Sequence, residues 1–124
     1  MHVEFIQAKY KTGVYIGELL EKRESEQKGL MKVLAVVKHP TQGDLHQPKQ
    51  SDVAYFHQRK ALAEFEKTWV PLATVTLYKG EVPSYKDSLK TAWQEKYDQL
   101  STKQTPFAQL SIQHLKELRT EYGI

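Results

Sequence analysis

The chain is most apolar at Leu30-Met31-Lys32-Val33-Leu34-Ala35-Val36-Val37. Apolar side chains fill both alternating sets of positions in this run, so a strand formed here is apolar on both faces. One face carries Met31, Val33, Ala35 and Val37, and the other carries Leu30, Leu34 and Val36. A strand of this kind lies in the middle of a fold, because a half-exposed strand keeps one polar face. Residues 30–37 are therefore the predicted central strand.

Four further short runs predict strands around this one, at residues 3–9, 14–22, 60–66 and 73–78. They are rich in β-branched and aromatic residues and are separated by glycine, proline and polar residues, as strands joined by turns are. Gly17, inside the second run, predicts a bulge or a tight bend, which lets a small sheet curl. Five short strands without helices between them predict a small antiparallel barrel.

The apolar spacing becomes helical after Pro83. Ser84, with Asp87 three residues later, resembles a capping box and predicts a helix start, and Thr105-Pro106 predicts a second one that ends at Gly123. Each helix has an apolar stripe: Tyr85, Leu89, Ala92, Trp93, Tyr97 and Leu100 in the first, and Phe107, Leu110, His114, Leu115, Leu118 and Tyr122 in the second. The expected fold is mainly β with a C-terminal α part. It is a single domain, 1–124, with a barrel at 1–79 and an antiparallel two-helix extension at 84–123.

Composition narrows the class of protein. Hydrophobic residues make up 40% of the chain and charged residues 27%, as in folded domains and unlike disordered ones. The absence of cysteine excludes disulfides, thiolate metal ligands, a cysteine nucleophile and cysteine-linked lipids. No run approaches the ~18 apolar residues that cross a bilayer. We therefore expect a cytoplasmic protein without membrane insertion, and a net charge of +3 is too small to require nucleic acid as the partner.

The candidate site is the long polar segment 38–52 and the residues that follow it. Loops longer than about 12 to 15 residues are uncommon in compact domains and are usually functional or disordered. A protein partner is expected here, at His39, Pro40, Gln42, Asp44, His46, Lys49, Tyr55, His57 and Arg59. The alternative is a plain connection between two strands, stiffened by its prolines.

Three other uses of the segment are weighed. His39, His46 and His57 with Asp44 or Asp52 are metal-ligand types, but their spacing matches no known site. The same histidines beside Ser51 could form an acid–base set, but no catalytic motif accompanies them. A basic, aromatic-bearing face for nucleic acid is the alternative function, and it would comprise Lys32, Lys38, Lys49, Tyr55, Phe56, Arg59 and Lys60. We expect no cofactor, no metal and no catalytic residue.

The chain resembles the kinase-associated protein B family in three long strings, at 10–18, 33–46 and 52–63. The resemblance continues through Trp69-Val70-Pro71, residues 80–89 and Thr105-Pro106-Phe107, so it covers nearly the whole chain. It implies an SH3-like β-barrel with a helical extension. It also implies a non-enzymatic regulator that supports a sporulation sensor histidine kinase, or another phosphorelay component, from the cytoplasm. Members of the family have been described as lipoproteins. This chain departs from that description, because it has no cysteine to carry the lipid. Recruitment to the inner face of the membrane would then come through the partner, and a homodimer is a further expectation.

Overall fold

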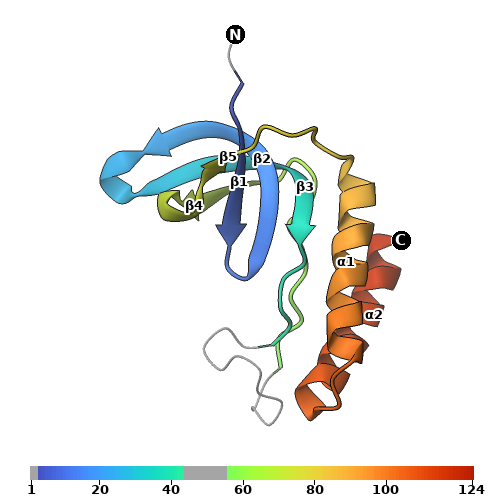
Figure 1. Cartoon of the computed structure of the whole chain (residues 1–124). Coiled ribbons are helices and arrows are strands. Elements are labelled where there is room, and N and C mark those ends of the chain that lie inside the picture. Colours follow the sequence, from blue (N-terminus) through green and yellow to red (C-terminus); the bar gives the residue numbers. More distant parts are fainter. Residues whose placement is uncertain (1–2, 44–55) are drawn as a thin grey trace.

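The computed structural model describes residues 3–43 and 56–124, which form one antiparallel sheet with two helices packed against one side of it (Figure 1). The strands run in the order β4-β3-β2-β1-β5 across the sheet. Their bounds are Phe5–Tyr10 for β1, Gly13–Arg23 for β2, Lys28–Lys38 for β3, Lys67–Pro71 for β4 and Thr76–Leu77 for β5. Short 3-10 turns, η1 at Glu24–Glu26 and η2 at Leu72–Thr74, precede β3 and β5. The helices are α1, Tyr85–Ser101, and α2, Pro106–Tyr122.

The predicted central strand is β3, which pairs with β2 on one side and β4 on the other. Met31 and Val33 on one face are fully buried, whereas Leu30 and Leu34 on the other face are half-buried, so the double apolar pattern predicted more burial than that face has. The alternation fails at the end of the strand, where Val36 is buried and Val37 is 37% exposed. The pairing of β2 with β3 leaves two extra residues in β3, Leu34 before this point and Val37 after Val36, so the change of faces falls between two bulges.

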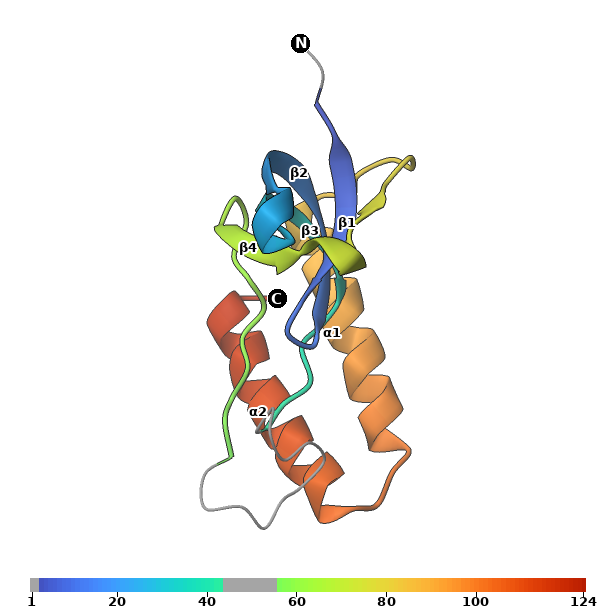
Figure 2. The same ribbon diagram turned by 90° about the vertical axis from the view of Figure 1, so that its left-hand side faces the viewer.

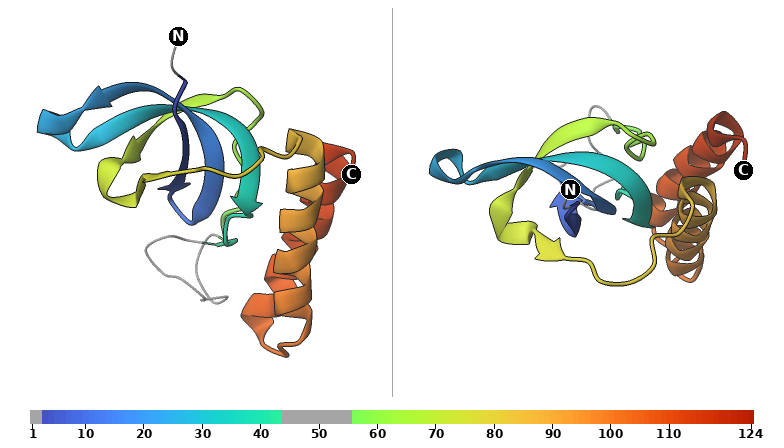
Figure 3. Two further views of the ribbon diagram at one scale, coloured as in Figure 1. Left: turned by 45° about the horizontal axis from the view of Figure 1, so that its top comes forward. Right: turned by 90° about the horizontal axis from the view of Figure 1, so that it is seen from above.

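A second register shift lies at Gly17, as predicted from its place inside a strand. A Cβ atom there would lie 2.5 Å from the Lys32 carbonyl oxygen, so the close approach of β3 requires glycine. Viewed from above, the sheet is strongly curved and η2 carries the chain around to β5 (Figure 3). β4 and β5 stand at opposite ends of the strand order, so the barrel-like sheet is not closed by hydrogen bonds. The predicted fold class, mainly β with two C-terminal helices, is confirmed.

The predicted strands at 60–66 and 73–78 are wrong in their details. The segment 56–63 is extended but joins no strand, and Phe65 has a positive φ of 68°, which turns the chain before β4. The Ala61–Leu62 backbone is instead hydrogen-bonded to tyrosine hydroxyls, a pairing that a period-2 pattern does not reveal. The second segment is divided between η2 and a β5 of only two residues.

Both helices begin where the sequence predicts. Ser84 Oγ accepts from the Asp87 N–H, and Thr105 Oγ1 accepts from the Ala108 N–H. Figure 2 shows that α1 and α2 run antiparallel, and the Trp93 indole N–H donates to the Leu115 carbonyl at 2.7 Å between them. The predicted helix pair is thus joined by a buried hydrogen bond as well as by apolar stripes.

One further hydrogen bond joins α1 to the bulge of β3. The Val36 N–H, which the bulge separates from the regular ladder, donates to Ser88 Oγ at 2.9 Å, and Ser88 itself is buried. The Ser88 hydroxyl donates in turn to the Tyr85 carbonyl at 2.8 Å. A buried hydroxyl therefore pairs a backbone donor that would otherwise be unsatisfied.

Replacing Ser88 with alanine is expected to lower the free energy of unfolding by about 1–3 kcal/mol, because the Val36 N–H would be buried without a partner. Urea unfolding measures the change. The matched control is Ser101→Ala, which removes an exposed hydroxyl at the end of α1 and should cost far less. Equal losses in the two variants would contradict the role assigned to Ser88.

Candidate functional site at the base of the long loop

The long connection between β3 and β4 has two described limbs, residues 39–43 and 56–63. They lie side by side next to the sheet (Figure 1). The Gly43 N–H donates to the His57 carbonyl at 2.8 Å. The Gln42 side chain pairs with both backbone groups of Arg59: its amide nitrogen donates to the carbonyl and its oxygen accepts from the N–H, each at 2.8 Å. A glutamine amide thus replaces a strand partner and fixes the two limbs together.

His39 connects the first limb to α2. It is fully buried, with Nδ1 3.0 Å from the Pro40 carbonyl and Nε2 2.9 Å from the Tyr122 hydroxyl. Because the Tyr122 oxygen accepts from the Ala61 N–H, its own proton is directed to His39 Nε2. His39 is therefore the neutral tautomer with its proton on Nδ1, donating to Pro40.

Burial, with a smaller contribution from the nearby Lys96 charge, lowers the pKa of His39 from its ordinary 6.5 to about 4. The hydrogen bond to Pro40 opposes this effect. His39 is consequently uncharged near neutral pH. Its two nitrogens are both occupied, so it has no lone pair for a metal.

The Ala61–Leu62 backbone is held by three tyrosines from three elements. Tyr122 in α2 accepts from Ala61, Tyr15 in β2 accepts from the Leu62 N–H at 3.3 Å, and Tyr85 in α1 donates to the Leu62 carbonyl at 2.6 Å. Burial raises the pKa of Tyr15 and of Tyr85 to about 12, so these hydroxyls stay protonated. We call the set of His39, Tyr15, Tyr85 and Tyr122 the loop latch.

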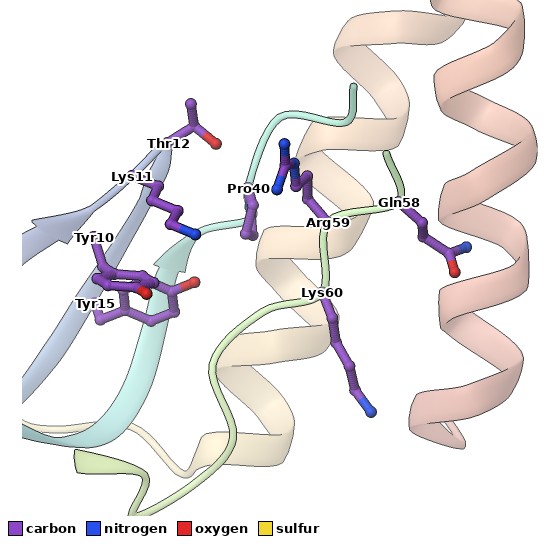
Figure 4. Close-up of a pocket in the computed structure, with 8 residues that line it drawn as sticks. All are labelled: Tyr10, Lys11, Thr12, Tyr15, Pro40, Gln58, Arg59 and Lys60. Carbon is purple, nitrogen blue, oxygen red and sulfur yellow. The ribbon is translucent and has the colours of Figure 1, made fainter. Parts of the chain in front are cut away.

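Beside the loop latch is a pocket of about 190 Å³ between the β1–β2 turn and the two limbs. Figure 4 shows its lining residues, which are Tyr10, Lys11, Thr12, Tyr15, Pro40, Gln58, Arg59 and Lys60. The turn is tied to the first limb, because the Thr41 N–H donates to Thr12 Oγ1 at 2.9 Å. Two tyrosine rings and a proline thus form the apolar part of a pocket whose charged groups are all cations.

The cations of this pocket differ in how they are paired. Lys60 extends toward α2 and binds Glu121 at 2.6 Å (Figure 4). The Arg59 Nε donates to the Gly43 carbonyl at 2.9 Å, and the Lys11 ammonium lies 5.4 Å from the centre of the Tyr10 ring. Within residues 3–43 and 56–124, no carboxylate forms an ion pair with Lys11 or Arg59. The pocket therefore has positive charge to offer an anionic partner.

The predicted site residues divide into three groups. His39, Pro40 and Gln42 were predicted to contact a partner, but they are buried, and the polar groups of His39 and Gln42 bond to other parts of the chain. Arg59 lines the pocket, and the His57 carbonyl joins the limbs. Asp44, His46, Lys49 and Tyr55 lie outside the described residues. Lys11 and Tyr10 were missed, because the β1–β2 turn lies far from the loop in sequence.

The alternative uses find little support in the described residues. There, no group of three His, Asp or Glu side chains could hold a metal ion. Phe56, proposed for stacking on a base, is stacked on His114 at 5.2 Å and packs against Phe107. Among those residues, too, no helix is long and apolar enough to span a membrane.

Comparison with known families adds to this geometry. Residues 10–123 match the family model of kinase associated protein B. The chain belongs to the kinase-associated protein B family. It is 49% identical over 113 residues to the kinase-associated lipoprotein B of Bacillus subtilis (strain 168), covering 91% of this chain and 87% of that one. The crystal structure of kinase-associated protein B from Bacillus cereus matches with a TM-score of 0.82 at 34% identity, over 100% of this chain and 99% of the other. The expected family is thus confirmed.

The stability of the chain is expected to fall as the pH drops from about 6.5 to about 4, and to lose up to about 3 kcal/mol from His39 alone. In this window the unfolded chain binds a proton at His39 and the folded chain does not. Above it neither binds one, and below it both do. Urea unfolding across this pH range measures the slope.

The matched variant is His39→Gln, which has no ionisable group at this position. Its unfolding free energy should depend less steeply on pH than that of the wild type over the same range. Identical slopes would show that His39 is not responsible.

Proposed function

We propose that this chain is a non-enzymatic regulator that binds a protein partner, and that the partner is a kinase. The relatives are named as kinase-associated proteins, and a family match over most of the chain supports a similar function here. The observation that carries the proposal is the pocket beside the loop latch. It is framed by hydrogen-bonded segments, it is partly apolar, and it contains two cations without a carboxylate partner in the described residues.

The chemistry of the pocket indicates the kind of segment that would bind. Lys11 and Arg59 would pair with acidic side chains, while Tyr10, Tyr15 and Pro40 would contact apolar ones. Such an arrangement gives specificity through charge complementarity and affinity through buried aromatic surface. We therefore propose an acidic segment of the kinase as the ligand of this pocket.

We further propose that the kinase is a sensor histidine kinase of the sporulation phosphorelay. The protein would act from the cytoplasm and be brought to the inner face of the membrane by its partner. Asp44, His46, Lys49 and Tyr55 remain proposed contacts, since they lie in the sequence between the two limbs that form the pocket. A homodimer also remains a proposal, which light scattering at several protein concentrations would test.

Reversing the charge at Lys11 is expected to weaken kinase binding by about tenfold or more, because an acidic segment would then meet a carboxylate. The histidine kinases of the native host are expressed one at a time, and their affinities for wild type and Lys11→Glu are measured by calorimetry. The thermal midpoint should be nearly unchanged, since Lys11 is exposed.

The control is Lys86→Glu, an exposed lysine of α1 outside the pocket, which should bind the kinase as the wild type does. Equal weakening of kinase binding by both variants would mean that the change in net charge, and not the pocket, causes the effect. Unchanged binding by Lys11→Glu would overturn the proposed site.

A further inference from the structure

A second pocket lies where the first limb of the loop meets the helices. Its volume is about 210 Å³, and it is formed by the end of β3, residues 41–42, α1, the α1–α2 connection and α2. Its lining differs from that of the pocket beside the loop latch and shares no residue with it. It is therefore a separate candidate site, and the argument for it does not rest on the proposed kinase binding.

All charged side chains among the described residues that line this pocket are positive. Lys38 at the end of β3, Lys96 in α1 and Lys103 in the α1–α2 connection all line it, and no described lining residue is Asp or Glu. Lys38 and Lys103 have no ion pair within the described ranges 3–43 and 56–124. Lys96 is only 9% exposed, and its charge is near enough to lower the pKa of His39. Three ammonium groups from separate elements thus create a positive potential in a recess partly withdrawn from water.

A buried hydroxyl also lines the pocket. Ser111 in α2 is fully buried, and its Oγ has no hydrogen-bond partner in the described structure. Serine hydroxyls in helices commonly donate to the carbonyl one turn earlier, and this one does not. A buried polar group left unpaired is costly and uncommon, and a bound ion is one of the recognised reasons for it. Ser111 therefore offers a donor in the recess that the three lysines surround.

We propose that this second pocket binds a phosphate-sized oxyanion, held by Lys38, Lys96 and Lys103 and by a hydrogen bond from the Ser111 hydroxyl. Lysine binds phosphate as a compact point charge, and the hydroxyl supplies a directional donor. A water molecule occupies about 30 Å³ of the liquid, so the pocket has room for a phosphate and the first atoms of a group that carries it. The ligand is therefore free phosphate or a phosphorylated side chain.

The test is the thermal midpoint of the full chain as sodium phosphate is added at pH 7.5, against sodium chloride at matched ionic strength. A ligand that binds only the folded state raises the midpoint until the site saturates. We expect a saturable rise with phosphate and none with chloride. O-phosphoserine forms a second arm, and a response at lower concentration than that of phosphate assigns the site to a phosphorylated side chain.

Two variants test whether the rise in the thermal midpoint with phosphate comes from binding in this pocket. Lys103→Ala should raise the phosphate concentration needed for half of the response by about tenfold, because it removes a charge-assisted contact. Ser111→Ala should raise it as well but should not lower the midpoint without phosphate, since the hydroxyl makes no hydrogen bond to lose. The control Lys90→Ala removes an exposed lysine of α1 outside the pocket and should respond as the wild type does.

Equal responses to phosphate and chloride would overturn the proposal. So would equal loss of response in Lys103→Ala and Lys90→Ala, or none in either, since both results mean an adventitious ion only. Kinase binding is assayed through Lys11→Glu, which lies outside this pocket, so the two proposals fail independently.

Discussion

The structure depends on how the Ala61–Leu62 backbone is satisfied without a neighbouring strand. Buried backbone groups need partners, and here tyrosine hydroxyls from β2, α1 and α2 provide them. Because these hydroxyls come from three elements, the same bonds that pair the backbone also fix both helices to the sheet. The Tyr122 hydroxyl in turn donates a hydrogen bond to His39 Nε2, which extends the arrangement to the other limb of the loop. Removing Tyr122 would leave two groups, the Ala61 N–H and His39 Nε2, without this partner.

The loop latch explains why two pockets flank one short segment. Residues 39–43 are held on one side by the β1–β2 turn and on the other by the helices, so each side leaves a recess lined by cations. The first recess has tyrosine walls and suits an acidic peptide. The second is enclosed by lysines and a buried hydroxyl and suits a small anion. The two sites proposed above would thus share one segment, residues 39–43, while they differ in chemistry.

Much of the fold could be predicted from the sequence, because β3, the Gly17 bend and both helix caps are local patterns. The irregular segment 60–66 could not, since its Ala61–Leu62 backbone bonds to tyrosines remote in sequence and only Phe65 and Glu66 bond to the β3 backbone. Val37 was placed on the wrong face, because a bulge leaves no trace in a regular alternation. The resemblance identified the family, and the long loop indicated the region of the site. The burial of His39 and Gln42 could not be predicted, because their partners Tyr122 and Arg59 are remote in sequence.

The pairing of Gln42 with Arg59 has a consequence for how such a protein can diverge. The limbs are fastened by side-chain and backbone bonds that end at Gly43 and His57. A change in the number of residues between these two positions need not propagate into the framework beneath. Family members could therefore differ in the peptide between these two positions, as antibodies differ in their hypervariable loops, while the hydrogen-bonded limbs stay the same.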